Sequence, residues 1–193
     1  TRGDFYPRVS ISHLGIIESA DLSRIKALGV TCNYTPWWFD ARHNDPMEIA
    51  LGADRYGNMY KAKSLFELGI NVTFSSDEWW GGERLPTYLN PYFGMQVGHT
   101  RQYPKEWRED DDVLIRSPVN EQLSIEQMIM GYTLNGAQQL RMEDQLGSIE
   151  TGKLADFVVL DENLFDMDRY KIWKVKPSAV VMEGKLIQGS LPE

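Results

Sequence analysis

The stretch Val72-Thr-Phe-Ser-Ser-Asp-Glu-Trp79 decides the fold, because an apolar run there ends in small hydroxyl residues and an acid. Its β-branched and aromatic residues follow Gly69-Ile70 and are typical of a buried strand in a parallel sheet. Asp77 then comes at the carboxyl end of that strand, where α/β sheets and barrels carry their chemistry. This one stretch therefore predicts both a strand and a functional acid.

A second strand end carries a histidine. Val9-Ser-Ile-Ser-His-Leu-Gly15 lies earlier in the chain, and His13 occupies the same place after its own strand that Asp77 occupies after the later one. Neutral imidazole nitrogen and carboxylate oxygen are usual donors of a catalytic zinc site. His13 and Asp77 are therefore candidate metal ligands, and two ligands alone do not hold a catalytic metal.

Working outward from these strands, the chain alternates between strand and helix patterns. A helix capped by Ser19 is predicted for residues 19–28, a strand for 30–34, a helix for 60–68 and a strand for 70–75. Gly29 and Gly69 end the two helices. This order predicts βαβ units with parallel strands and right-handed crossovers.

Three further helix starts are marked by their first residues. Pro46 is expected to begin a short helix, and Asn90 to cap one that has Pro91 at its first position. Ser124 and Gln127 form a capping box at the start of the most strongly patterned helix in the chain.

The pattern changes at Gly147. Residues 147–156 are rich in turn formers, residues 157–160 are predicted to form a strand, and residues 179–187 a hairpin around Glu183-Gly184. We therefore expect an α/β part over residues 1–146 and a small β module over residues 147–193.

Composition limits the classes of partner. The 193 residues are 42% hydrophobic and 25% charged, as in ordinary globular proteins. A formal net charge of -8 argues against a nucleic-acid partner, and no apolar run is long enough for a membrane span. The single cysteine, Cys32, excludes an internal disulfide and is expected to be buried. With no signal peptide visible, a cytoplasmic location is favoured, although the first residue is not Met.

Tryptophans follow the predicted strand ends on the face where a ligand would bind, at positions 37, 38, 79 and 80. Trp37 and Trp79 are candidate walls of a substrate pocket, although packing between long loops explains such residues equally well.

Taken together, several motifs resemble the C-terminal part of the amidohydrolase superfamily. These are His13 after its strand, Asp77 in Phe74-Ser-Ser-Asp77, Thr133-Leu-Asn-Gly-Ala137, and above all Gly147-Ser-Ile-Glu-Thr-Gly-Lys-Leu-Ala-Asp-Phe-Val-Val-Leu160. The closest similarity is to the YtcJ-like branch, which includes N-substituted formamide deformylase.

The resemblance implies an α/β fold, the C-terminal portion of a (β/α)8 TIM-type barrel followed by part of a small β-sandwich. It implies a divalent metal, zinc in the first place, with one or two ions in the whole protein. His13 would be a ligand on strand six and Asp77 a ligand on strand eight. Asp77 would also be catalytic, taking a proton from metal-activated water that attacks the amide-like carbonyl of a small-molecule substrate, whose C–N bond is then cleaved. Arg55 and Arg101 fall where family members often have an arginine that binds substrate.

One departure from the family pattern concerns the other ligands. The family's first-strand His-x-His pair is absent, since the chain's histidines are His13, His43 and His99. The missing N-terminal part of the barrel, or a homo-oligomer partner, is expected to supply the rest, so this chain alone is expected to be inactive. The alternative is a non-catalytic, amidohydrolase-like binding or regulatory module. A third possibility, a cupin- or lectin-like binding domain, would account for the C-terminal β module but not for the βα units that precede it.

Overall fold

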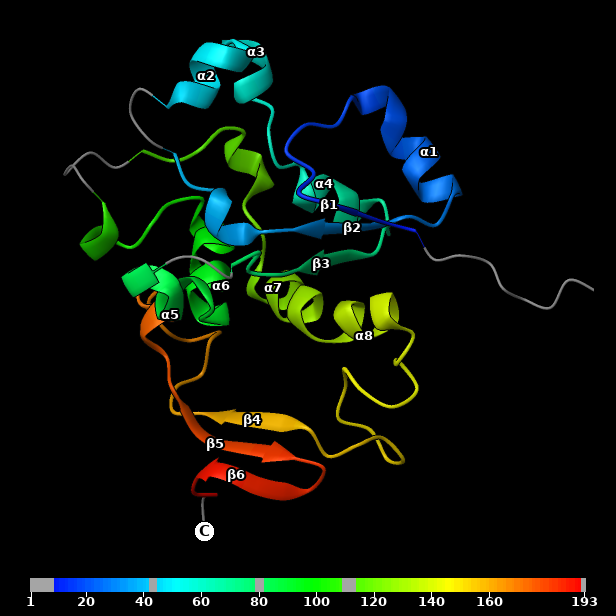
Figure 1. Cartoon of the computed structure of the whole chain (residues 1–193), viewed down its shortest axis with the longest axis vertical. Helices are drawn as coiled ribbons and strands as arrows, with labels where there is room; N and C mark the ends of the chain where they lie inside the picture. The colour runs from blue at the N-terminus through cyan, green and yellow to red at the C-terminus, as the bar shows by residue number, and fades with distance from the viewer. Residues whose placement is uncertain (1–8, 42–44, 79–81, 109–113, 192–193) are drawn as a thin grey trace, which may run out of the picture.

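The computed structural model describes residues 9–41, 45–78, 82–108 and 114–191, which form a mixed α/β structure with two three-stranded sheets (Figure 1). The first sheet contains β1 (Ser10–Ser12), β2 (Thr31–Tyr34) and β3 (Val72–Phe74) in that order. The second contains β4 (Phe157–Leu160), β5 (Pro177–Met182) and β6 (Lys185–Gly189).

The first sheet is parallel throughout, as the strand and helix order predicts. Cys32 in β2 lies opposite Ile11 of β1 and Val72 of β3. The connecting helices are α1 (Leu22–Ala27) and α4 (Ala62–Glu67), and each is followed by a glycine with left-handed backbone, Gly29 and Gly69. The predicted Ser19 cap is wrong, because residues 19–21 form a 3-10 turn ahead of α1 and no side chain caps that helix.

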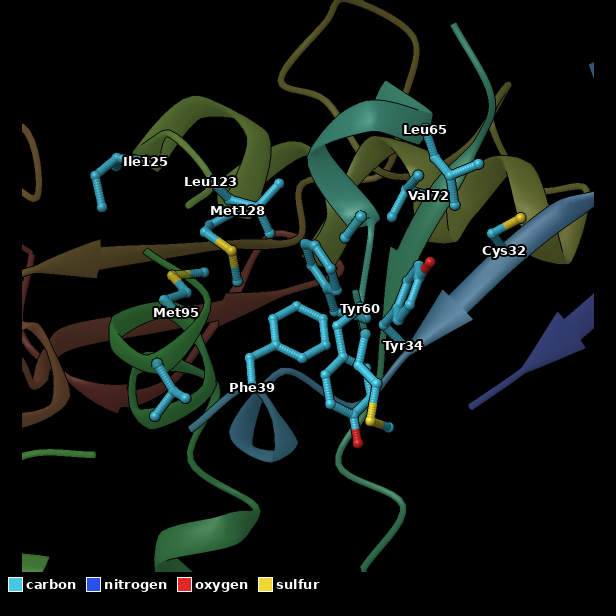
Figure 2. Packing of buried hydrophobic residues seen from close by; sticks show 14 of the residues in the cluster. Cys32, Tyr34, Phe39, Tyr60, Leu65, Val72, Met95, Leu123, Ile125 and Met128 are labelled. Carbon is cyan, nitrogen blue, oxygen red and sulfur yellow. The ribbon is translucent and has the colours of Figure 1, made fainter. Parts of the chain in front are cut away.

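The two faces of the first sheet differ because successive side chains of a strand point to opposite sides. On one face Cys32, Tyr34 and Val72 are buried in the main hydrophobic core, shown in Figure 2 together with Leu65 of α4 and Met128 of α7 (Ile125–Tyr132). Close packing of α7 on β3 requires Gly131, since a Cβ there would lie 2.3 Å from the Phe74 ring.

The opposite face of the sheet carries a hydrogen-bonded set of polar side chains. Asn33 Nδ2 donates to Thr73 Oγ1 at 3.0 Å, and Ser75 Oγ donates to Asn33 Oδ1 at 2.8 Å. Thr73 Oγ1 in turn donates to Gln139 Oε1 of α8 (Leu134–Leu140) at 2.7 Å. These bonds satisfy polar groups that are largely buried, so this face is fixed by specific contacts and not by apolar packing alone.

The other described helices are α2 (Pro46–Leu51), α3 (Ala53–Tyr56), α5 (Leu85–Tyr88) and α6 (Pro91–Thr100). The predicted starts at Pro46 and Asn90 are confirmed, with Asn90 Oδ1 accepting from the Tyr92 N–H at 3.0 Å. The capping box of Ser124 and Gln127 is confirmed as well. The sequence pattern did not predict α8, which begins after Thr133, a residue with non-helical backbone angles (φ -126°, ψ -95°).

The second sheet is antiparallel and includes the predicted hairpin around Glu183-Gly184. It joins the rest of the molecule through η6 (Ile172–Lys174), whose Trp173 carbonyl accepts from Asn90 Nδ2 at 3.1 Å. In Figure 1 this sheet lies at one end of the molecule with β6 outermost. Across the described ranges, no helix has the length and apolar character needed to cross a membrane.

Candidate metal site

The structure brings the two predicted ligands together. His13 follows β1, Asp77 comes shortly after β3, and β2 lies between these strands. His13 Nε2 and Asp77 Oδ1 are 3.7 Å apart, with side-chain exposures of 45% and 41%. Because carboxyl ends of parallel strands meet at one edge of a sheet, residues far apart in sequence share a solvent-accessible site.

Both residues adopt a backbone conformation that is uncommon outside glycine. The φ angles of His13 and Asp77 are 65° and 51°. Left-handed backbone costs a non-glycine residue roughly 1–2 kcal/mol, and such strain gathers at functional sites where surrounding contacts enforce it. One such contact is the His13 N–H, which donates to the Asn33 carbonyl at 3.0 Å and extends the sheet ladder past the end of β1.

Two tryptophans of η2 (Pro36–Trp38), the turn that directly follows β2, contact this region. The Trp38 ring stacks on the His13 imidazole with centroids 5.1 Å apart and planes at 26°. The Trp37 indole N–H donates to the Ser76 carbonyl at 2.7 Å, and its ring stacks on Tyr88 at 4.3 Å. Trp37 is thus engaged in packing between loops, one of the two roles that the sequence left open.

Arg101 is a core residue, which corrects its prediction as a substrate contact. Its side chain has 0% exposure. Its guanidinium donates to four backbone carbonyls, those of Met59, Tyr60, Arg116 and Ser117. Burial, with the nearby Arg116 charge, lowers the pKa of Arg101 to about 10. Arg101 therefore crosslinks two backbone segments and leaves no surface for a substrate.

Of the remaining candidates that the structure describes, Arg55 and His99 do not lie at the His13 and Asp77 pair. Arg55 is exposed on α3. Trp79 lies outside the described residues, as does His43. His99 is half-buried in α6, where its Nδ1 lies 2.6 Å from the Leu123 carbonyl.

Sequence patterns missed a second buried arginine, Arg116, because it stands in a polar loop with no periodic signal. Only 3% of Arg116 is exposed. It lies 3.9 Å from the Asp45 carboxylate, and its guanidinium covers the Tyr56 ring at 4.2 Å. Arg116 therefore fastens the α2–α3 segment to the core.

The donor pair fits part of a metal site. Two donors that each lie about 2.0–2.1 Å from one tetrahedral zinc ion are roughly 3.4 Å apart. The 3.7 Å between His13 Nε2 and Asp77 Oδ1 is close to that separation. Within the described ranges, no three His, Cys, Asp or Glu residues cluster as a complete site would require. The described residues therefore offer two donors at this edge of the sheet, fewer than the three protein ligands that a catalytic zinc site uses.

Comparison with known proteins identifies the family to which the chain belongs. The model of the amidohydrolase family matches residues 1–188. The chain belongs to the amidohydrolase family. This confirms the resemblance inferred from the sequence at the level of the superfamily, while the narrower YtcJ-like branch stays a prediction.

Individual relatives match parts of the chain. Imidazolonepropionase of Bacteroides fragilis is 44% identical over 54 residues, which cover 28% of this chain and 13% of that enzyme. Protein LONG AFTER FAR-RED 3 of Arabidopsis thaliana is 26% identical over 167 residues, covering 85% of this chain and 26% of that protein. The chain therefore spans about an eighth to a quarter of these curated relatives.

A solved structure supports the same fold. An adenosine deaminase from Xanthomonas campestris with bound zinc superposes with a TM-score of 0.61 at 18% identity, covering 93% of this chain and 37% of that one. At this identity the likeness establishes the fold alone, a mixed α/β fold of the amidohydrolase family.

Proposed function

We propose that this chain supplies the His13 and Asp77 part of a metal-dependent hydrolase that cleaves a non-peptide, amide-like C–N bond in a small molecule. The observation that carries the proposal is the 3.7 Å approach of His13 Nε2 to Asp77 Oδ1 at neighbouring strand ends in a member of the amidohydrolase family. In this proposal β1–β3 are the last three strands of a (β/α)8 barrel. The sheet β4–β6 is part of the accompanying sandwich, with the boundary near residue 146.

The donor set favours a divalent ion such as zinc, which when bound lowers the pKa of a water molecule toward neutrality. The zinc in the Xanthomonas campestris neighbour supports this choice, with one or two ions in the whole protein. His13 Nε2 would hold the ion as a neutral imidazole. Asp77 would share in holding it and would act as the general base.

The proton chemistry follows from the position and exposure of Asp77. With 41% of its side chain exposed, its carboxylate is within reach of water and of a small substrate. As a carboxylate it takes a proton from the attacking water. As the resulting acid it returns that proton to the leaving nitrogen, which otherwise would depart as a poor, anionic leaving group.

Further donors are required, because the described residues supply two where a catalytic zinc uses three protein ligands. We propose that they come from the preceding part of the barrel or from a second copy of the chain. The chain alone is then inactive toward substrate, and neither nucleic acid nor membrane is a partner.

Zinc titration by isothermal calorimetry tests the site in this chain. We expect one weakly bound zinc ion, and at least tenfold weaker binding in His13→Gln and in Asp77→Asn. Asp54→Asn is a matched control, because Asp54 is an exposed acid on α3 away from the strand ends. Equal affinities in wild type and both site variants would overturn the assignment of these ligands.

A non-catalytic, amidohydrolase-like module is the second candidate, favoured by the lack of a complete ligand cluster in the described part of the chain. The polypeptide of the natural length, loaded with zinc, discriminates between the two. Hydrolysis of N-acyl, formamide or cyclic amide substrates that is lost in Asp77→Asn supports the enzyme. No hydrolysis of any of these, with no zinc retained, supports the binding module.

A further inference from the structure

Of two adjacent aromatic residues, Trp38 stacks on the candidate ligand His13 and Trp37 hydrogen-bonds Ser76, the residue before the candidate ligand Asp77. They belong to η2, which is separated from β2 by the single residue Thr35. Because β2 lies between β1 and β3, this short turn lies between the two strand ends that lead to His13 and Asp77. A rigid group at that position can set the distance from one ligand to the other.

Trp38 acts on the histidine side. Its ring lies nearly parallel to the imidazole, at 26° and 5.1 Å between centroids. Rotation of the imidazole about its bond to Cβ would break that stack, so Trp38 restricts the direction in which Nε2 points. The backbone bond from the His13 N–H to the Asn33 carbonyl fixes the main chain beneath it.

Trp37 acts on the aspartate side. Its indole N–H donates to the carbonyl of Ser76, the residue that precedes Asp77, at 2.7 Å. The stack on Tyr88 at 4.3 Å keeps the indole in place. The rings of Trp37 and Trp38 pack edge to face at 5.7 Å and 80°, which couples the two supports.

We propose that Trp37 and Trp38 are positioning residues that hold the His13 imidazole and the Asp77 carboxylate in register for a single metal ion. The metal part of this inference rests on the proposed function, whereas the placement of the two side chains does not. Outer partners that orient metal ligands typically change metal affinity 10- to 100-fold when they are lost.

The first experiment follows the His13 ring directly by NMR in histidine-labelled protein. The chain has only three histidines, so His13→Gln assigns the signal. Because the Trp38 indole stacks on the imidazole, we expect its ring current to shift the His13 ring protons of wild type upfield. We expect Trp38→Leu to remove that shift and Trp38→Phe to keep part of it, because phenylalanine retains an aromatic face.

The second experiment measures the zinc dissociation constant of the same variants by calorimetry. We expect Trp38→Leu to weaken zinc binding about tenfold or more, by loss of ligand orientation. Trp37→Phe keeps a ring against Tyr88 but loses the indole N–H, so a smaller loss is expected. Trp107→Leu is the control, since Trp107 is another half-buried tryptophan that packs on Phe93 and Trp173.

The outcomes separate the two proposals. A Trp38→Leu variant with wild-type His13 signals and wild-type zinc affinity overturns the positioning role. So does a Trp107→Leu variant that weakens zinc as much as Trp38→Leu does. Zinc affinity that does not change in His13→Gln refutes the metal site itself, and the NMR shifts then still decide whether Trp38 places the imidazole. Thermal unfolding confirms that each variant is folded, and Trp38→Phe serves if Trp38→Leu is not.

Discussion

The parallel sheet β1–β3 and the antiparallel sheet β4–β6 each have three strands, yet they differ in how far they are buried. Every residue of β2 and β3 is buried, whereas every residue of β6 is exposed. In β5 only Ala179 and Val181 are buried. The candidate metal donors follow β1 and β3, on either side of the fully buried β2, and a packed strand between them can hold side chains within the narrow geometry that a metal requires.

The edge strands β1 and β6 do not share this difference in burial. Like β6, β1 is exposed at all of its residues, although it leads directly to His13. Because β1 is exposed, packing of this strand in the core does not explain the position of the His13 side chain. Its position depends instead on contacts made from β2 and the turn after it, namely the Asn33 carbonyl and the Trp38 ring.

The largest loss of stability is expected when the buried Arg101 is replaced. Arg101 and Arg141 both end a helix with left-handed backbone, at φ 55° and 60°, but only Arg101 is buried. Arg101→Met leaves four backbone carbonyls without their donor and should lower the free energy of unfolding by about 3 kcal/mol.

Urea denaturation measures this loss, and Arg141→Met is the matched control. Because Arg141 is exposed, its replacement should change the free energy of unfolding by about 0.5 kcal/mol or less. Equal losses in the two variants would show that the backbone position, and not the buried crosslink, determines the cost.

A thiol probe tests the burial of β2. Burial raises the pKa of Cys32 to about 11, and its side chain has 0% exposure. We expect its reaction with a disulfide reagent at pH 8 to be at least about 100-fold slower than that of an exposed thiol, because the thiolate is the nucleophile. The double variant Cys32→Ser, Val158→Cys places the thiol on β4 and should react rapidly. Similar rates at both positions would contradict the difference between the sheets.

The same substitution in each sheet gives an intermediate effect. Val72 of β3 has 0% exposure and Val158 of β4 has 48%. Val72→Ala should cost about 2 kcal/mol of stability, since it removes buried methyl groups and leaves a cavity. Val158→Ala should cost about 0.5 kcal/mol or less. A larger loss for Val158→Ala in chemical denaturation would mean that another surface covers the second sheet in solution.

The smallest effect concerns the contact between α6 and the segment that links β4 to β5, where Arg169 Nη2 donates to the His99 carbonyl at 2.7 Å. Burial and the Arg169 charge lower the pKa of His99, outweighing the bond to the Leu123 carbonyl that raises it. The unfolded chain then binds a proton at this position more readily than the folded chain does. Stability from His99 is therefore complete above its ordinary pKa of about 6.5 and declines as the pH falls through that value.

Urea denaturation at pH 7.5 and pH 5.5 measures this dependence. His99→Gln cannot bind the proton, so it should lose less stability on acidification than wild type loses. An unchanged pH dependence in His99→Gln would show that other groups account for it.

Local patterns predicted much of the fold. The parallel strand order, the starts at Pro46, Asn90 and Ser124, and the hairpin around Glu183-Gly184 depend on residues close together in the sequence, and the structure agrees. The helix α8 was not predicted, because it starts where the backbone angles of Thr133 interrupt the preceding helix, and no capping side chain marks that start.

The sequence by itself determined that His13 and Asp77 lie at carboxyl ends of parallel strands, because the period of apolar residues fixes where each strand stops and parallel pairing brings those ends to one edge. Only the tertiary structure decided that Trp38 stacks on His13 and that Arg101 is buried among carbonyls of residues 59–60 and 116–117. Those contacts join segments distant in the chain, and their geometry arises from the packing of the core as a whole, which no local pattern encodes.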